Sequence, residues 1–258
     1  PPPTVVGWLL ALDAQLSEHL VEPERVRRFH GEEQPQFKAA LEALVAAGGR
    51  VKSKLDVIAT VIAKMAQREE LLDLVVAYRA LKATYGLLDF SDQIAGAFRL
   101  ATEFPEVGAQ QRDTYRVVLL DEYQDTSVAQ ARLLAGLFSG ETPDLGRGHP
   151  VTAVGDPHQA IYGWRGASVA KIEHFRDQFP QADGSAADRF SSTVNRRSDS
   201  RILQVANTLA APLLEASGGL VEPLVARQGV EQGVVRAVLH RTDLDELAWL
   251  VSEIKGAH

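Results

Sequence analysis

The sequence predicts an α/β protein in which a parallel sheet follows a helical domain. Two observations predict the sheet: short apolar runs at residues 115–120 and 151–156 indicate strands, and the stretch between them, 127–138, indicates a helix. A strand, a helix and a strand in this order form one unit of a parallel sheet. The third observation is a helical spacing of apolar residues from about Thr4 to Tyr85, which predicts the helical domain.

The helical domain is predicted over residues 1–85. Its stretches "VVGWLLALDAQLSEHL", "FKAALEALVAAGGRV" and "LDVIATVIAKMAQREELLDLVVAYRALKATY" place apolar residues at i, i+3, i+4 and i+7. The glycines of "AAGGR", residues 46–50, predict the end of a helix. No catalytic cluster is visible in this part, so we expect an accessory domain.

The remaining elements follow the same patterns. The runs "YRVVLL" and "VTAVGD" lack polar alternation, which predicts strands that are buried on both faces of the sheet. Residues 167–179, 199–216 and 244–254 have helical spacing, and "GVVRAVLH" at 233–240 predicts one more strand.

The composition is that of an ordinary globular protein. The 258 residues carry a net charge of −7, with 45% hydrophobic and 24% charged residues. No apolar run approaches the roughly 20 residues that span a bilayer, and no signal region opens the chain. Cysteine is absent, which excludes disulfides and thiolate metal sites. We therefore expect a cytoplasmic protein with no membrane partner.

Carboxylates follow both predicted strands. Asp121 and Glu122 end the first run, and Asp156 ends the second. Ligands of parallel sheets bind beyond the carboxyl ends of the strands, where a carboxylate can hold Mg²⁺ beside phosphate oxygens. A neighbouring carboxylate can deprotonate an attacking water. Two bland alternatives stay open: acidic residues are common at strand ends, and Asp125, like Thr126 or Ser127, can cap the next helix.

Three longer strings resemble one family. The strings "DEYQDT", "VGDPHQAIYGWRGA" and "NRRSDSRILQVAN" are similar to motifs II, III and IV of the UvrD/Rep group of superfamily 1 DNA helicases, and "LLDFSDQ" at 87–93 is similar to a motif upstream of them. The resemblance implies part of a P-loop NTPase (RecA-like) parallel-sheet motor domain with a helical insertion domain. Residues 1–85 would be the insertion, 86–186 the later part of motor domain 1A, and 187–258 the opening of motor domain 2A.

The resemblance also implies ATP and Mg²⁺ as cofactors and a role for each matching residue. Asp121 would hold Mg²⁺ and Glu122 would activate water. Gln159 would reach the γ-phosphate or its water, and Gln124 would belong to the same ATP site. Arg197 would contact the γ-phosphate from the second motor domain, as an arginine finger does.

The partner that the resemblance implies is single-stranded DNA. Tyr162 and Trp164 could stack on bases and Arg165 could pair with a phosphate, although either ring could instead belong to the core. Two positions depart from the family pattern. Arg196 replaces the tyrosine that lies against adenine, which puts adenine binding in doubt, and Ala160 replaces a serine beside Gln159.

The chain contains no G-x-x-x-x-G-K-[ST] string, the loop that cradles phosphates. The family places that loop upstream and two further motifs downstream, so we expect an internal fragment of a larger helicase that hydrolyses little ATP alone. Three alternatives stay open. One is a non-catalytic DNA-binding or scaffolding subunit. Another is the motor of a helicase–nuclease that processes double-strand breaks in DNA repair, such as the actinobacterial AdnA/AdnB proteins, with a nuclease or second motor subunit as partner. The last is a different P-loop enzyme such as a kinase.

Overall fold

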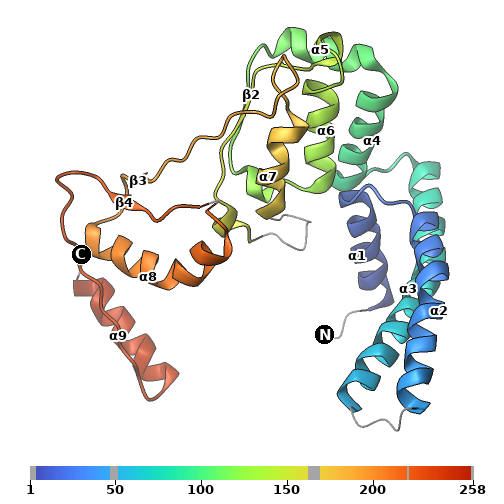
Figure 1. Cartoon of the computed structure of the whole chain (residues 1–258). Helices are drawn as coiled ribbons and strands as arrows, with labels where there is room; N and C mark the ends of the chain where they lie inside the picture. The colour runs from blue at the N-terminus through green and yellow to red at the C-terminus, as the bar shows by residue number, and fades with distance from the viewer. Residues whose placement is uncertain (1–3, 47–51, 162–168, 220, 257–258) are drawn as a thin grey trace. The chain divides into compact units, whose positions relative to one another are not determined.

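The computed structural model describes residues 4–46, 52–161, 169–219 and 221–256, which form two compact units, residues 1–188 and 189–258 (Figure 1). The described chain is mostly helical, with two small parallel sheets. The elements of the first unit are α1 (Val5–Glu18), α2 (Pro23–Ala46), α3 (Lys52–Tyr85), α4 (Phe90–Glu103), α5 (Pro105–Thr114), β1 (Val118–Leu120), α6 (Val128–Phe138), β2 (Val151–Ala153) and α7 (Val169–Gln178), with short 3₁₀ turns η1 (Tyr123–Asp125), η2 (Pro143–Leu145) and η3 (Pro157–Gln159).

The helical spacing before Tyr85 is confirmed by α1, α2 and α3. Thr4 caps α1 by accepting a hydrogen bond from the Gly7 N–H. The helix α2 begins at Pro23, earlier than the predicted stretch, because proline suits the first turn of a helix. The long helices α2 and α3 lie side by side (Figure 1), and α1 packs on α3 through Leu16, Leu72 and Val75. The predicted glycine stop lies outside the described residues.

A buried ion cluster joins α1, α3 and the start of α4. The Lys82 ammonium donates to Asp13 at 2.8 Å, to Asp89 at 3.0 Å and to Asp92 at 2.7 Å. Asp13 also accepts from Arg79 at 2.6 Å. The carboxylates of Asp13, Asp89 and Asp92 lie close enough to share a metal ion, but the Lys82 ammonium already supplies the positive charge among them.

The predicted strand–helix–strand unit is confirmed. The strands β1 and β2 pair in parallel, with Val118 opposite Val151 and Leu120 opposite Ala153, and α6 connects them. Ser127 is the residue that caps α6: its side chain accepts from the Gln130 N–H, and the Gln130 side chain accepts from the Ser127 N–H. The cap interpretation of Asp125 is therefore wrong.

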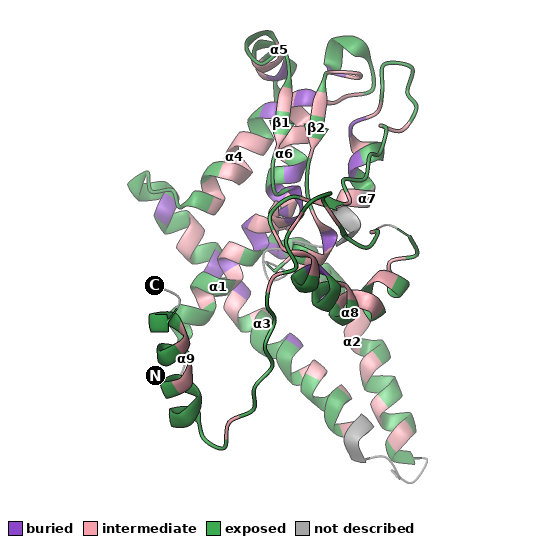
Figure 2. Cartoon of the chain, turned by 90° about the vertical axis from the view of Figure 1, so that its left-hand side faces the viewer, coloured by how far each residue is buried: buried purple, intermediate pink, exposed green. Residues whose placement is uncertain are grey.

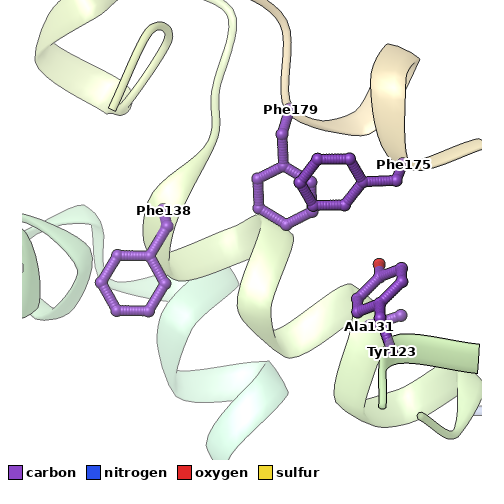
Figure 3. Close-up of a cluster of buried hydrophobic side chains, with 5 residues drawn as sticks. All are labelled: Tyr123, Ala131, Phe138, Phe175 and Phe179. Carbon is purple, nitrogen blue, oxygen red and sulfur yellow. The ribbon is translucent and has the colours of Figure 1, made fainter. Parts of the chain in front are cut away.

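A second hydrophobic cluster of the first unit lies on one face of this sheet. It is built from five buried side chains of α6, η1 and the segment from α7 to Phe179, which are Tyr123, Ala131, Phe138, Phe175 and Phe179 (Figure 3). The inward-facing strand residues pack against this cluster; these are Val118, Leu120, Val151 and Ala153.

The opposite face of the sheet is exposed. Leu119 is 76% exposed and Val154 is 61% exposed, and both strands show exposed positions in Figure 2. The expectation that both strands are buried on both faces is wrong for the part of the chain that the structure describes. The physical reason is that α6 and α7 cover one face, and no described element covers the other.

The second unit contains β3 (Val194–Asn195), α8 (Ser200–Ala216), β4 (Val225–Ala226) and α9 (Asp243–Gly256), with β3 and β4 paired in parallel. The helices confirm two predictions, but residues 233–240, all of which are described, form no strand. Apolar runs form strands only when a neighbour supplies hydrogen bonds, and here Leu239 is 98% exposed. The preceding segment instead caps α8, because Ser200 N–H donates to the Glu231 carbonyl.

Across the described ranges, no helix combines the length and apolar character that a membrane crossing requires.

Candidate functional site

Asp121 and Glu122 lie directly after β1, where backbone hydrogen bonds join the ends of both strands. The Val154 N–H donates to the Leu120 carbonyl at 2.8 Å, and the Tyr123 N–H donates back to the Val154 carbonyl at 3.0 Å. The carboxylates after β1 and the turn after β2 therefore share one edge of the sheet. This placement confirms the predicted arrangement of the strand ends.

Glu122 has an unusual backbone conformation. Its φ of 50° and ψ of 40° lie in the left-handed region, which a residue with a side chain adopts at a cost of about 1–2 kcal/mol. The Glu122 N–H donates to Asp121 Oδ1 at 2.9 Å. Both side chains are exposed, so an ion or a water can reach them.

Gln124 lies beneath Glu122 and is fully buried, with 0% of its surface exposed. Its Nε2 donates to Glu122 Oε2 at 2.7 Å, and its Oε1 accepts from the Asp156 N–H at 3.2 Å. Gly155 permits this approach, because a Cβ at that position would lie 2.5 Å from Gln124 Oε1. The side-chain amide thus joins the segment after β1 to the segment after β2.

Asp156 extends the connection to Gln159. Its Oδ1 accepts from the His158 N–H at 2.9 Å, and its Oδ2 accepts from Gln159 Nε2 at 2.9 Å. A chain of three hydrogen bonds therefore runs from Glu122 through Gln124 and Asp156 to Gln159. Glu122 and Gln159, which the sequence places 37 positions apart, are brought together at one site.

The site has the chemistry for water activation beside a metal-bound phosphate. Asp121 is an exposed carboxylate of the kind that Mg²⁺ takes as one ligand, with phosphate and water oxygens as the others. Glu122 is a second carboxylate whose direction is set by Gln124. These residues fit a magnesium–nucleotide, although the predicted roles of Asp121, Glu122, Gln124 and Gln159 stay predictions.

Tyr123 is a buried residue of the site that the sequence reasoning missed. Burial raises the pKa of its hydroxyl to about 12. Its ring meets Phe175 of α7 edge-on, with centroids 5.3 Å apart, and its hydroxyl lies 3.4 Å from Gln178 Oε1. Its burial could have been inferred from the sequence, because Tyr123 is the one aromatic residue in the polar string "DEYQDT". Tyr123 anchors α7, which follows the predicted DNA-contacting segment.

The residues predicted to contact DNA, which are Tyr162, Trp164 and Arg165, lie outside the described residues. Arg197 lies in the second unit, just after β3, where Asn195 Oδ1 accepts from its N–H at 3.0 Å and from the Ser198 N–H at 2.8 Å. Arg196 and Arg197 are exposed, and neither has an ion pair within the described ranges. The action of Arg197 beside Glu122 stays a prediction.

The chain is similar to known helicases. The UvrD/REP helicase N-terminal domain matches residues 13–180. DNA helicase II of Salmonella typhimurium is 34% identical over 182 residues, which is 69% of this chain and 23% of that protein. DNA helicase II of Escherichia coli is 33% identical over the same shares. ATP-dependent DNA helicase UvrD1 of Mycobacterium tuberculosis is 35% identical over 133 residues, or 52% of this chain and 16% of that protein.

These matches identify the family of the chain and the share of each relative that it covers. The chain spans about a quarter of the length of the DNA helicase II proteins. The matches support the UvrD type and give no support for the AdnA/AdnB subtype. Because the family match covers well over half of the chain and includes the segments after β1 and β2, the chain belongs to the UvrD/REP helicase family.

Proposed function

We propose that this chain supplies part of the ATPase site of an ATP-dependent DNA helicase, which couples ATP hydrolysis to movement along single-stranded DNA. The observation that carries the proposal is the hydrogen-bond chain from Glu122 to Gln159 at the shared ends of two parallel strands. Family membership supports a P-loop motor fold. We also propose a role in DNA repair and a cytoplasmic location.

Each residue has a distinct task in this proposal. Asp121 binds Mg²⁺, which would neutralise charge on the phosphate oxygens. Glu122 accepts a proton from the attacking water, and Gln159 holds that water or the γ-phosphate. Arg197 stabilises the charge that develops during transfer. Gln124 belongs to the ATP site through its hydrogen bond to Glu122. The buried support beneath Glu122 favours a catalytic role over scaffolding, which needs no oriented carboxylate.

The DNA side of the proposal rests on the segment between η3 and α7. Tyr162 and Trp164 would stack on bases without sequence preference, and Arg165 would pair with the backbone. Residues 1–85 would be the helical insertion, 86–186 part of the first motor domain, and 187–258 the opening of the second. This chain alone would hydrolyse little ATP.

The test uses the full-length parent protein. We expect ATPase activity that single-stranded DNA stimulates, and we expect Glu122→Gln to abolish turnover while nucleotide binding persists. Glu141→Gln is the matched control, since Glu141 is an exposed glutamate in the loop between α6 and β2. A parent protein without ATPase activity, or a Glu122→Gln variant with near-normal turnover, would contradict the proposal.

A further inference from the structure

Gln124 uses both ends of its amide, yet it is fully buried and exposes no atom to a nucleotide in the described chain. We propose that Gln124 is a positioning residue, which aims the Glu122 carboxylate and ties its direction to the turn formed by Asp156 and Gln159. The inference rests on the proposed function, because it deepens the role of Glu122 as the base.

The hydrogen-bond pattern fixes the orientation of the amide. The Asp156 N–H can only donate, so it must face the oxygen of Gln124. The nitrogen of the amide then faces Glu122, whose carboxylate can only accept. A side chain with one donor and one acceptor is required here, and an ionised carboxylate or an apolar group cannot meet both partners.

The surroundings hold the amide tightly. An added Cβ on Gly155 would lie 2.5 Å from Gln124 Oε1 and 3.1 Å from Ile172 Cδ1, so the segment after β2 passes very close to the amide. Any shift of that segment must therefore shift Gln124. Because Gln124 Nε2 holds Glu122, the direction of the carboxylate follows the segment after β2.

Gln159 provides the other end of this connection. Its amide donates to the carboxylate of Asp156, whose backbone N–H holds Gln124. When Gln159 leaves Asp156 to engage a phosphate or a water, the restraint on Asp156 changes, and Gln124 passes that change to Glu122. The base is thus aimed according to whether Gln159 is engaged.

The experiment compares three variants of the full-length parent protein. Gln124→Met keeps the side-chain volume but removes the donor and the acceptor. Gln124→Glu keeps the shape, and its protonated form can donate to Glu122 and accept from Asp156. Gln178→Met is the control, since Gln178 lies on α7 and contacts Tyr123 rather than Glu122. The measurements are kcat and KM for ATP at saturating single-stranded DNA, from about pH 6 to about pH 9, with a thermal melt of each variant.

We expect Gln124→Met to lower kcat roughly 10- to 100-fold and to change KM for ATP less than about twofold, because Glu122 is still present but no longer oriented, so part of the general-base contribution is lost while ATP binding is not. Burial and the neighbouring carboxylate raise the pKa of a glutamate at this position. The kcat of Gln124→Glu relative to wild type should therefore rise as the pH falls, a trend that a merely structural role does not produce. Gln178→Met should match wild type.

Three results would overturn the inference in an active parent protein: an unchanged kcat in Gln124→Met, a raised KM at normal kcat, or a Gln124→Glu profile parallel to wild type. If Gln124→Met does not fold, the pH profile of Gln124→Glu decides alone. A wild-type parent without ATPase activity would instead overturn the proposed function, and the positioning role with it.

Discussion

Lys82 Nζ lies 2.8 Å from Asp13 Oδ2, and the two residues are 69 positions apart in the chain. Asp13 is only 2% exposed and Lys82 is 7% exposed. The pair joins α1 to α3, and Asp89 at the N-terminus of α4 completes the contact. The helical segment before Tyr85 is thereby attached to the element that leads into the sheet.

Replacing Lys82 with methionine should destabilise the first unit. The substitution leaves the Asp13 carboxylate buried with Arg79 as its remaining partner, and loss of one member of a buried pair costs about 3 kcal/mol. Urea unfolding measures the effect. Lys38→Met is the control, because Lys38 is exposed on α2 and forms no ion pair within the described residues. Equal stability of the two variants would show that the cluster does not hold the helices together.

The same cluster predicts how stability depends on pH. Burial alone would raise the pKa of Asp89, but the Asp92 N–H and Lys82 lower it below its ordinary value. A lowered carboxyl pKa contributes stability that is present above the unfolded pKa, near 3.8, and is lost as the pH falls through the folded value. Stability should therefore fall in this acid range, and Asp89→Asn should flatten the dependence. An unchanged slope in urea melts at several acid pH values would contradict this.

At alkaline pH, stability should change in the opposite direction and fall as the pH rises. Burial works to lower the pKa of Lys82, but hydrogen bonds to Asp13, Asp92 and Asp89 raise it above its ordinary value. Burial also raises the pKa of Tyr123 to about 12. Both groups contribute stability that is complete below their unfolded pKa values and is lost as the pH rises through the folded values. Ultraviolet titration should detect Tyr123 ionising at a pH above the ordinary range of a tyrosine hydroxyl.

Gly155→Ala should impair catalysis by displacing Gln124. The new Cβ would lie 2.5 Å from Gln124 Oε1, closer than any ordinary contact. We expect the ATPase activity of the parent protein to fall about 10-fold, because Gln124 no longer orients the Glu122 carboxylate. Gly96→Ala is the control: its Cβ meets nothing within 4 Å, and alanine favours the helix α4. Normal activity of Gly155→Ala would mean that the amide can move aside without consequence.

Trp164→Ala should weaken binding of single-stranded DNA by the parent protein. One stacked base contributes about 1–3 kcal/mol, so the dissociation constant should rise roughly 5- to 150-fold. Fluorescence anisotropy with a labelled oligonucleotide measures it. Trp8→Ala, which removes an exposed tryptophan from α1, should bind normally. Equal affinity of both variants would contradict the DNA contact and favour the alternative in which the Trp164 ring belongs to the core.

Local patterns predicted the parts of the fold that depend on local chemistry. The helices follow from the spacing of apolar residues, and the strand–helix–strand unit follows from two short apolar runs that flank one helix. The strand at 233–240 was wrong, because strand formation needs a partner that the sequence does not show. Burial on both faces of β1 was wrong for the same reason, since Leu119 has no cover among the described residues.

The connection beneath Glu122 could not be predicted. It depends on a close approach at Gly155, a residue without a side chain, and on a backbone N–H that sequence patterns do not reveal. Motif resemblance identified Gln124 and Gln159 but not the bonds that link them. The cluster around Lys82 was missed because Lys82 and Asp13 are distant in sequence and because lysine and aspartate are common in helices, so no pattern marks them.

The left-handed backbone of Glu122 has a consequence for protein engineering. Glycine would adopt that conformation freely, but Glu122→Gly would also remove the carboxylate that accepts from Gln124 Nε2 and would leave a fully buried donor without this partner, at a cost of about 1–3 kcal/mol. The backbone gain of about 1–2 kcal/mol is of similar size, so a screen for heat tolerance would discriminate only weakly between glutamate and glycine at this position. Directed evolution of this family for robustness alone would therefore do little to preserve the carboxylate, and selection would have to score turnover and melting together.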